Sequence, residues 1–360
     1  MAVQSFPWNT VNTLVGDFVA PNARRQIYQS NALLNRLNAR KKSYPGGREI
    51  QQPLVWKQDG LGQWFTGADI LNTAITDTVQ MAKTTPKGFA IPMVIAKTDE
   101  WTVRGKNAIM SLAELKGEEV MATAKHIMAG DLYNDGTDQM KLTGLQYIFK
   151  DFTGTAPGVL PAQTYCGIAR QGRYDGSGGG TQTNNWWIHA GDDTAYTDVA
   201  GGGGGFDPLQ PGAVMSTLGK MWATIQLQAG ANRTPTLILS NVGAFTVYTN
   251  MGFLNDRNLR PQMDGKAFEA GYDNAKYKRA VWMVDEKCPR SSAKVEKIYF
   301  INEDTLRLFV HPEADFSFEP FRKPHNQMAR VGYILWYGEL MCIEPRCNGV
   351  MSSVSVATYS

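Results

Sequence analysis

Three neighbouring segments of contrasting character, at the start of the chain, restrict its possible folds more than any other feature. Residues 1–48 form a basic arm with few hydrophobic side chains, and residues 49–70 carry the aromatic side chains of a predicted hairpin. After a further extended stretch, helical periodicity predicts one long helix from Asn107 to Tyr133. A compact enzyme has little use for a protruding arm, a protruding hairpin and a solitary helix, whereas a subunit that holds its neighbours uses all three. These segments therefore predict a structural protein that assembles with copies of itself.

Composition agrees with this interpretation without requiring it. The 360 residues suffice for two or three domains of about 150 residues each. Charged residues make up 19% of the chain, against about 25% in typical soluble proteins. A surface poor in charge and rich in aromatic and amide side chains is typical of buried interfaces. An ordinary secreted or β-rich protein would show the same composition.

The net charge of +3 is unevenly distributed. Residues 1–48 hold seven basic residues and one acidic residue, Asp17, so the arm carries +6 and the remainder about −3. A basic arm on a nearly neutral body suits a polyanion or an acidic patch on a partner. A solvated helix face accounts for the same charges.

The four cysteines, Cys166, Cys288, Cys342 and Cys347, are scattered along the chain. The first residues, Met-Ala-Val-Gln-Ser, do not form a signal-peptide pattern. We interpret the cysteines as reduced thiols in a protein made in the cytoplasm. No apolar run approaches the roughly 18 residues of a membrane span, so no membrane partner is expected.

Helical spacing predicts three main helices: Asn22–Asn38 in the arm, the long helix, and Pro211–Ala229. The inward face predicted for the long helix comprises Ile109, Leu112, Leu115, Val120, Ala124, Ile127 and Met128. The inward face predicted for the third helix comprises Met215, Leu218, Trp222, Ile225 and Leu227. A further helix or turn is expected to start at Asn241.

The aromatic hairpin is predicted from a strand over Glu49–Lys57, a turn at Asp59-Gly60 and a returning strand over Gln63–Thr66. A two-stranded ribbon is marginally stable on its own in water. Its aromatic side chains therefore need a cover, and a neighbouring subunit is the simplest one. The side chains concerned are Trp56, Trp64 and Phe65.

Other extended segments are expected later in the chain, and the tail from Asn348 is small and polar. In Phe89–Thr98, Pro92 indicates an edge strand or a bulge, because proline cannot donate a ladder hydrogen bond. A glycine-rich surface excursion lies between residues 151 and 210. The remaining predicted strands are Ile75–Met81, Thr236–Ser240, Lys297–Ile301, Thr305–His311, Phe316–Phe321, Gln327–Tyr337 and Glu339–Glu344.

Catalytic constellations are scarce in this sequence. The four histidines lie far apart, and phosphate-binding loops, dinucleotide fingerprints and nucleophile elbows are missing. Cys342 and Cys347 have a zinc-like spacing without a second pair nearby, which favours a strand with two buried thiols. Asp192, Asp193 and Asp198 could bind a cation, but a plain polar loop explains them better. We expect no enzyme activity, and no catalytic, cofactor or metal residues.

The order of these segments resembles the major capsid proteins of tailed bacteriophages with the Hong Kong 97-type fold. The likeness spans nearly the whole chain, and the order of segments carries most of its weight. Similar local runs are Gly46–Leu54, Trp101–Asn107, Leu132–Thr137, Tyr299–Asn302 and Pro345–Val350.

This resemblance implies an α+β capsid fold. Its parts would be an N-arm (1–45), an E-loop hairpin (46–72), a peripheral domain with the long spine helix (73–135), an axial domain (136–284) with a glycine-rich insertion (172–206), and a closing β section (285–360), mainly in the peripheral domain. Copies would form the pentamers and hexamers of an icosahedral shell that encloses double-stranded DNA. A scaffolding protein and a portal would be partners, and a decoration protein is a further candidate. The protein would be assembled in the host cytoplasm and reside in the virion.

The resemblance also implies roles for individual residues. Contacts between subunits would involve Trp56, Lys57, Trp64 and Phe65. Contacts with DNA, a scaffold or a neighbour would involve Arg24, Arg25, Arg40, Lys41 and Lys42. Some members join subunits by a lysine–asparagine bond, for which Lys57 with Asn326 or Asn348 are the candidates. A solvated or ion-paired Lys57 is the more ordinary interpretation.

Two other functions remain open from the sequence. An encapsulin-type bacterial compartment would have the same fold and hold a cargo enzyme instead of a genome. A secreted β-rich glycan-binding module would use exposed aromatic side chains, for which Trp186, Trp187 and Tyr196 are the candidates.

Overall fold

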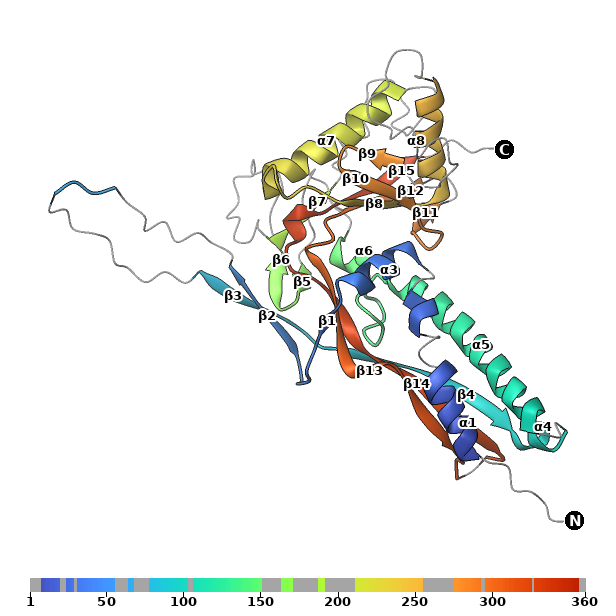
Figure 1. Cartoon of the computed structure of the whole chain (residues 1–360). Coiled ribbons are helices and arrows are strands. Elements are labelled where there is room, and N and C mark those ends of the chain that lie inside the picture. The colour runs from blue at the N-terminus through green and yellow to red at the C-terminus, as the bar shows by residue number, and fades with distance from the viewer. Residues whose placement is uncertain are drawn as a thin grey trace, which may run out of the picture.

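The computed structural model describes residues 8–19, 24–28, 31–55, 64–67, 78–102, 106–150, 163–170, 187–191, 211–254, 275–292, 295–325 and 327–355. Within them, the molecule is elongated, with a seven-stranded sheet at one end and a four-stranded sheet running to the other (Figure 1). The helical elements are α1 (Trp8–Leu14), η1 (Val15–Val19), α3 (Ala32–Ala39), α4 (Lys97–Thr102), α5 (Lys106–Asp131), α6 (Leu145–Ile148), α7 (Pro211–Ala229), α8 (Val242–Leu254) and η4 (Pro345–Cys347).

The four-stranded sheet has the order β1-β13-β14-β4, with β1 (Lys42–Ser43) parallel to β13 and the other pairs antiparallel. β13 (Leu306–Arg322) and β14 (Ala329–Cys342) each unite two strands that the sequence predicts separately. The register shifts between Val310 and Asp315, so an irregularity rather than a turn divides β13. The polar residues at this irregularity resemble a turn signal in the sequence.

The edge strand β4 (Lys87–Ala96) has one face that packs against the core and one face that is open to solvent. Ile91, Met93 and Ile95 are buried in one core with side chains of α5, whereas Pro92 and Val94 point to the open face. Pro92 lies on the edge strand that its chemistry predicts.

The long helix α5 confirms the predicted helix to within two residues at each end. Its buried stripe includes Ala113, Val120, Ala124 and Met128. Leu115, which the periodicity places on this face, is instead 61% exposed. Two residues turn a helix by about 200°, so Leu115 lies opposite Ala113.

The seven-stranded sheet has the order β7-β15-β12-β8-β10-β9, with β11 paired to β12. Its strands are β7 (Ala190–Gly191), β8 (Leu237–Ser240), β9 (Ala275–Tyr277), β10 (Ala280–Val284), β11 (Arg290–Ser292), β12 (Val295–Ile301) and β15 (Gly349–Ser355). Alternate residues serve two cores: Ile238 packs with α7 and α8, while Leu237 and Leu239 join the main core on the other face.

The strand β15 corrects the expectation of a small polar tail. It pairs with β12 and β7, and Val350, Met351 and Val354 are buried. The segment 285–360 is thus shared between the two sheets, because β12 and β15 lie in the larger one and β13 and β14 in the smaller one.

Helix α7 confirms the predicted helix Pro211–Ala229. Leu218, Trp222 and Ile225 are buried as expected, but Met215 and Leu227 are exposed. Val214 and Met221 complete the inward stripe in their place, since the spacing 214, 218, 221, 222 and 225 keeps to one side of a helix.

The arm does not protrude, which contradicts the sequence-based expectation for its described residues. Val11, Val15, Ile27 and Leu34 are each at most 1% exposed and belong to the chain's own main core. The single predicted helix is also wrong: residues 24–28 are helical, but Asn31 is extended (φ −123°, ψ 136°) and caps the separate helix α3.

Among the described helices, none is both long enough and apolar enough to cross a membrane.

Candidate functional site

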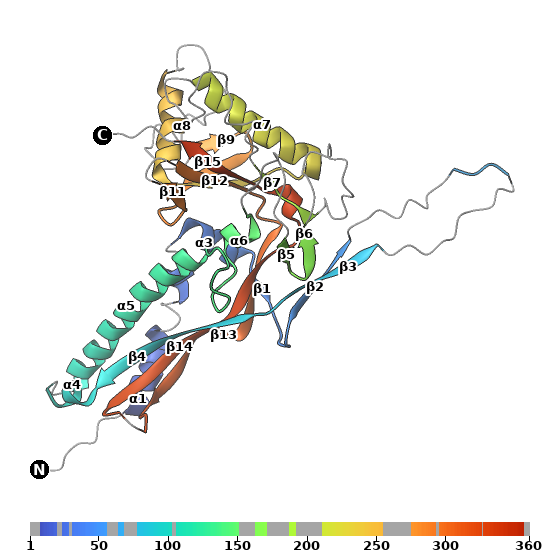
Figure 2. The same cartoon turned by 180° about the vertical axis from the view of Figure 1, so that it is seen from behind.

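A projecting two-stranded ribbon is the most conspicuous surface feature of the described chain. β2 (Ile50–Val55) pairs antiparallel with β3 (Val79–Thr84), in a register that runs from Ile50–Thr84 to Val55–Val79. The predicted return strand Gln63–Thr66 is therefore wrong: residues 64–67 form no strand. Both views show the ribbon leading away from the body (Figures 1 and 2).

The base of the ribbon is fixed to the body. Ile50, Leu54 and Ala82 are buried in the main core. The backbone N–H of Lys83 donates to the carbonyl of Cys166, in the small hairpin of β5 (Gln163–Tyr165) and β6 (Ile168–Arg170), at 2.9 Å. The direction of the ribbon is thus determined by the fold.

Apolar side chains are exposed on the face of the ribbon opposite these buried residues, and in residues 64–67, which belong to no strand. Trp64 is fully exposed, and Phe65, Val55, Val79 and Met81 are between 41% and 74% exposed. Burying one tryptophan side chain stabilises a contact by roughly 4–6 kcal/mol before the entropy loss of association. Exposed aromatic and aliphatic side chains of this kind are typical of a binding surface. Trp56 and Lys57 lie outside the described residues.

The open face of the four-stranded sheet is a second apolar surface. Pro92 of β4 lies opposite Tyr333 of β14, and both side chains are exposed. Val94, on the same face of β4, is 44% exposed. Helix α5 contributes side chains to the core on the other face, together with Ile91. On the open face, Val331 of β14, the partner of Val94, is buried, so the exposed part consists of Pro92, Val94 and Tyr333.

The basic candidates in the arm divide into two groups. Arg24 and Lys41 pair with Asp315, at 3.7 Å and 2.5 Å, and Arg40 pairs with Asp304. Arg25 and Lys42 are exposed at the surface. Contact of any of these residues with DNA, a scaffold or a neighbour stays a prediction.

Buried thiols and polar groups belong to the core. Cys342 lies at the end of β14 and Cys347 in η4, and burial raises the pKa of each thiol to about 12. Asn348, a cross-linking candidate, is fully buried, and its amide donates to Thr305 Oγ1 at 2.9 Å. This excludes a reactive role for Asn348 in the fold described. Lys57 and Asn326 lie outside the described residues.

The glycan-binding interpretation loses one of its aromatic candidates. Trp187 is fully buried and stacks on Tyr165, with ring centroids 5.6 Å apart. A side chain that is inaccessible to solvent cannot stack on a sugar. Trp186 and Tyr196 lie outside the described residues.

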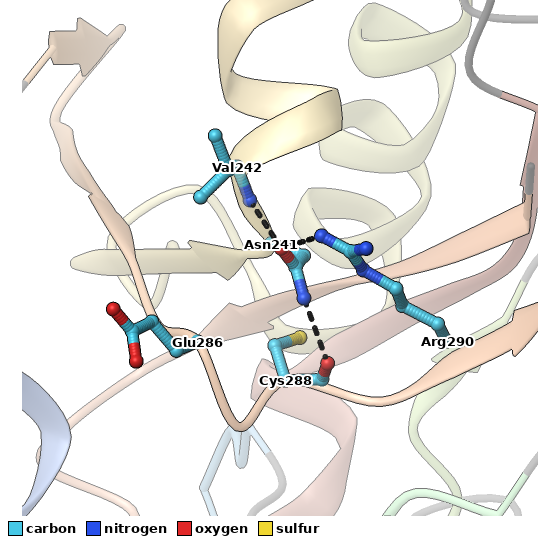
Figure 3. Close-up of a pocket in the computed structure, with 5 residues that line it drawn as sticks. All are labelled: Asn241, Val242, Glu286, Cys288 and Arg290. Atoms are coloured by element: carbon cyan, nitrogen blue, oxygen red, sulfur yellow. Dashed lines mark hydrogen bonds between the residues drawn. The ribbon is translucent and has the colours of Figure 1, made fainter. Parts of the chain in front are cut away.

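A pocket of about 440 Å³ lies where β8 leads into α8 (Figure 3). Its polar groups bind one another: Asn241 donates to the carbonyl of Cys288 at 3.2 Å and accepts from the backbone N–H of Val242 and from Arg290. Burial raises the pKa of the Cys288 thiol. The thiol is thus protonated and unsuited to nucleophilic attack. The other lining residue is Glu286.

Possible metal ligands are not grouped in the described part of the chain: no three of its His, Cys, Asp and Glu residues come together in a way that could hold an ion.

Comparison of the sequence with protein families and with curated proteins finds no match. Solved structures are similar in fold. The chain matches the capsid of cyanophage A-1(L) with a TM-score of 0.57 and 14% identity, over 91% of this chain and 93% of that one. It matches the capsid of a native GTA particle with a TM-score of 0.53 and 9% identity, over 89% and 90%. The SrpI encapsulin of Synechococcus elongatus PCC 7942 gives a TM-score of 0.50 and 11% identity, over 93% and 91%. The chain therefore has the Hong Kong 97-type capsid fold that its segment order resembles.

Proposed function

We propose that this protein is the major capsid protein of a tailed bacteriophage and builds an icosahedral shell from copies of itself. The observation that carries the proposal is the projecting ribbon with its exposed Trp64 and Phe65, on a fold shared with shell proteins over about nine-tenths of the chain. The ribbon leaves the body with its apolar side chains uncovered, and another subunit supplies the missing cover.

The acceptor for the ribbon is the open face of the four-stranded sheet in a neighbouring subunit. This face offers Pro92, Val94 and Tyr333, an apolar and aromatic surface of matching chemistry. Donor and acceptor are different surfaces of one chain, so the contact is heterologous, and it forms a ring where the rotation between neighbours closes. Each contact can be weak, because many act together in a shell.

Pentamers and hexamers form from the same chain in this proposal, and the shell encloses double-stranded DNA. The likeness to the cyanophage A-1(L) capsid supports it. The inner face of the shell contacts the DNA through its phosphates, so the affinity depends strongly on salt concentration. A scaffolding protein and a portal take part in assembly, a decoration protein is a further candidate partner, and the protein resides in the virion. The proposal gives the chain no catalytic role.

An encapsulin-type compartment is the second candidate, because the SrpI encapsulin complex of Synechococcus elongatus matches the chain over a similar share of its length. The two candidates differ in what the shell contains: DNA in one case and a cargo protein in the other.

Expression of the full chain, alone and with a co-expressed scaffold candidate, tests the proposal. Negative-stain microscopy should show hollow particles of uniform size. Monomers and small oligomers under every condition would contradict it. Nuclease-protected DNA in particles from infected cells supports the phage shell, whereas a co-purifying protein cargo without DNA favours the compartment.

A further inference from the structure

The arm follows an unexpected course over its own chain. Tyr28 and Lys41 both reach Asp315 in β13: the Tyr28 hydroxyl donates to Oδ1 at 2.7 Å, and Lys41 Nζ lies 2.5 Å from Oδ2. Two positions thirteen residues apart are thus fastened to one carboxylate. After Lys41, β1 pairs with β13, and the Tyr44 N–H donates to the Val310 carbonyl at 2.9 Å. Both ends of this segment belong to the four-stranded sheet.

Between these ends, residues 31–36 reach the other sheet. Asn31 Nδ2 donates to Asp285 Oδ2, directly after β10, at 2.8 Å. Arg36 Nη1 lies 3.1 Å and 3.2 Å from the two oxygens of Glu303, two residues after the end of β12. Both acids follow strands of the seven-stranded sheet. The chain therefore reaches the seven-stranded sheet between two attachments to the four-stranded one, and α3 lies between the two sheets in Figure 1.

The middle of the segment is held firmly. Asp285 also accepts from the Tyr133 hydroxyl at 2.6 Å, just beyond the end of α5, and Glu303 accepts from Thr236 Oγ1 at 2.8 Å. Leu33, Leu34 and Leu37 are at most 2% exposed and fill the space beneath. Hydrogen bonds to buried carboxylates are among the stronger ones in proteins.

We propose that Tyr28 and residues 31–41 form an internal strap that fixes the angle between the two sheets, and that this angle sets the curvature at which copies assemble. The link between this angle and the curvature of the assembly rests on the proposed function. The strap holds its own subunit in shape, and contact with a neighbour is left to the ribbon.

The variant Asn31→Asp isolates the strap. Aspartate keeps the oxygen that accepts from the Leu33 and Leu34 N–H groups, so the cap of α3 is retained. It loses the amide donor and places a second carboxylate against Asp285. In the unassembled protein, amide exchange over residues 32–40 should become about tenfold faster, since a hydrogen bond to a charged group is lost. Small-angle scattering should show a shifted radius of gyration.

The exchanged pair Asn31→Asp with Asp285→Asn provides the rescue. It restores one amide and one carboxylate across the same contact, so exchange and radius of gyration should return to the wild-type values. Arg25→Gln, on the exposed surface of the same arm, is the matched control and should change neither. Unchanged exchange in Asn31→Asp, or a change that the exchanged pair does not reverse, overturns the strap. If Asn31→Asp fails to fold, Asn31→Ser replaces it, because serine keeps the cap without adding a charge. Amide exchange and the radius of gyration of that variant then test the strap.

Particle diameters test the link between the strap and the curvature of the shell. Shells of Asn31→Asp should show a shifted mean or a broader distribution of diameters by electron microscopy, and the exchanged pair should restore the wild-type distribution. Wild-type diameters combined with faster exchange in the arm overturn the link to curvature. If the wild-type chain forms no shells, the proposed function fails, while exchange and scattering in solution still decide whether the strap exists.

Discussion

Single glycines differ sharply in whether the fold tolerates a side chain. A Cβ added at Gly144 would lie 2.1 Å from the backbone N of Asn134, and backbone atoms cannot move aside cheaply. A Cβ at Gly130, in the last turn of α5, meets nothing within 4 Å. We expect Gly144→Ala to lower the free energy of unfolding by about 3 kcal/mol or more. Gly130→Ala should raise it by up to about 1 kcal/mol. Chemical denaturation of the unassembled protein measures both, and equal effects would contradict the prediction.

The carboxyl group of Glu339 links stability to pH. It is fully buried and accepts from the N–H groups of Thr143 and Leu340 at 2.8 Å and 3.0 Å, with Lys87 Nζ 3.4 Å away. Burial raises its pKa, and the nearby Lys87 charge only partly offsets this. The folded state therefore holds this proton more tightly than the unfolded state, so this group's contribution to stability falls as pH rises from the unfolded pKa through the folded one.

Glu339→Gln should remove that contribution while keeping an oxygen for the two N–H donors. The stability of this variant relative to wild type should rise as the pH increases above the ordinary glutamate pKa of about 4.3. Denaturation curves over a pH series that starts at that value measure the difference. The exposed Glu313→Gln is the control, and a difference that is independent of pH in Glu339→Gln would contradict the prediction.

The sequence predicts the inward face of a helix correctly only where its hydrophobic side chains follow the helical period. Leu218, Trp222 and Ile225 were predictable as core, because they follow the helical period. Leu227 was wrongly predicted as inward from its hydrophobic type, although two residues turn a helix by about 200° and so place it opposite Ile225.

Among the elements, regular helices and strands follow from the sequence, but strand partners do not always. The ribbon was predictable as a ribbon, whereas its pairing was not. Asp59-Gly60 is a strong local turn signal and suggested a short hairpin. The actual partner of β2 is β3, across residues 56–78. Non-local pairing of this kind depends on tertiary contacts such as the buried Ile50 and Ala82, which no local pattern contains.

The ribbon should matter for assembly and not for the fold of the single chain. Replacing both Trp64 and Phe65 with alanine removes exposed side chains, so the free energy of unfolding of the monomer should change by less than about 0.5 kcal/mol. Shell formation should be lost or strongly reduced, as measured by sedimentation and microscopy. Met140→Ala, at a residue that is 87% exposed elsewhere, is the matched control. Normal shells from the double variant would contradict the role of the ribbon.

At the scale of the whole molecule, the capsid fold was recognisable from the order of its segments, but the course of the arm was not. The charge of +6 in residues 1–48 suggested an arm directed outward. In the structure, the acids Glu303, Asp304 and Asp315 of the same chain take up much of it. Those acids lie more than 250 residues away in sequence. No local reading of the arm identifies them as its partners.

This pairing predicts which basic residues affect binding to DNA. The double variant Arg25→Gln with Lys42→Gln removes two exposed charges, and the slope of log affinity against log salt should fall by roughly 2. Arg40→Gln should change the slope little, because its charge already pairs with Asp304. Titration of the unassembled protein with duplex DNA at several salt concentrations measures the slopes. An equal reduction in both variants would contradict the assignment.

The strand β15 also bears on how the chain is synthesised. It lies between β12 and β7, and the smaller sheet has β14 between β13 and β4, so both sheets are completed by the last sixty residues described. A nascent chain that still lacks β14 and β15 has neither sheet complete, and pairing across such long sequence separations is slow. Both sheets therefore close only after these late strands have been synthesised.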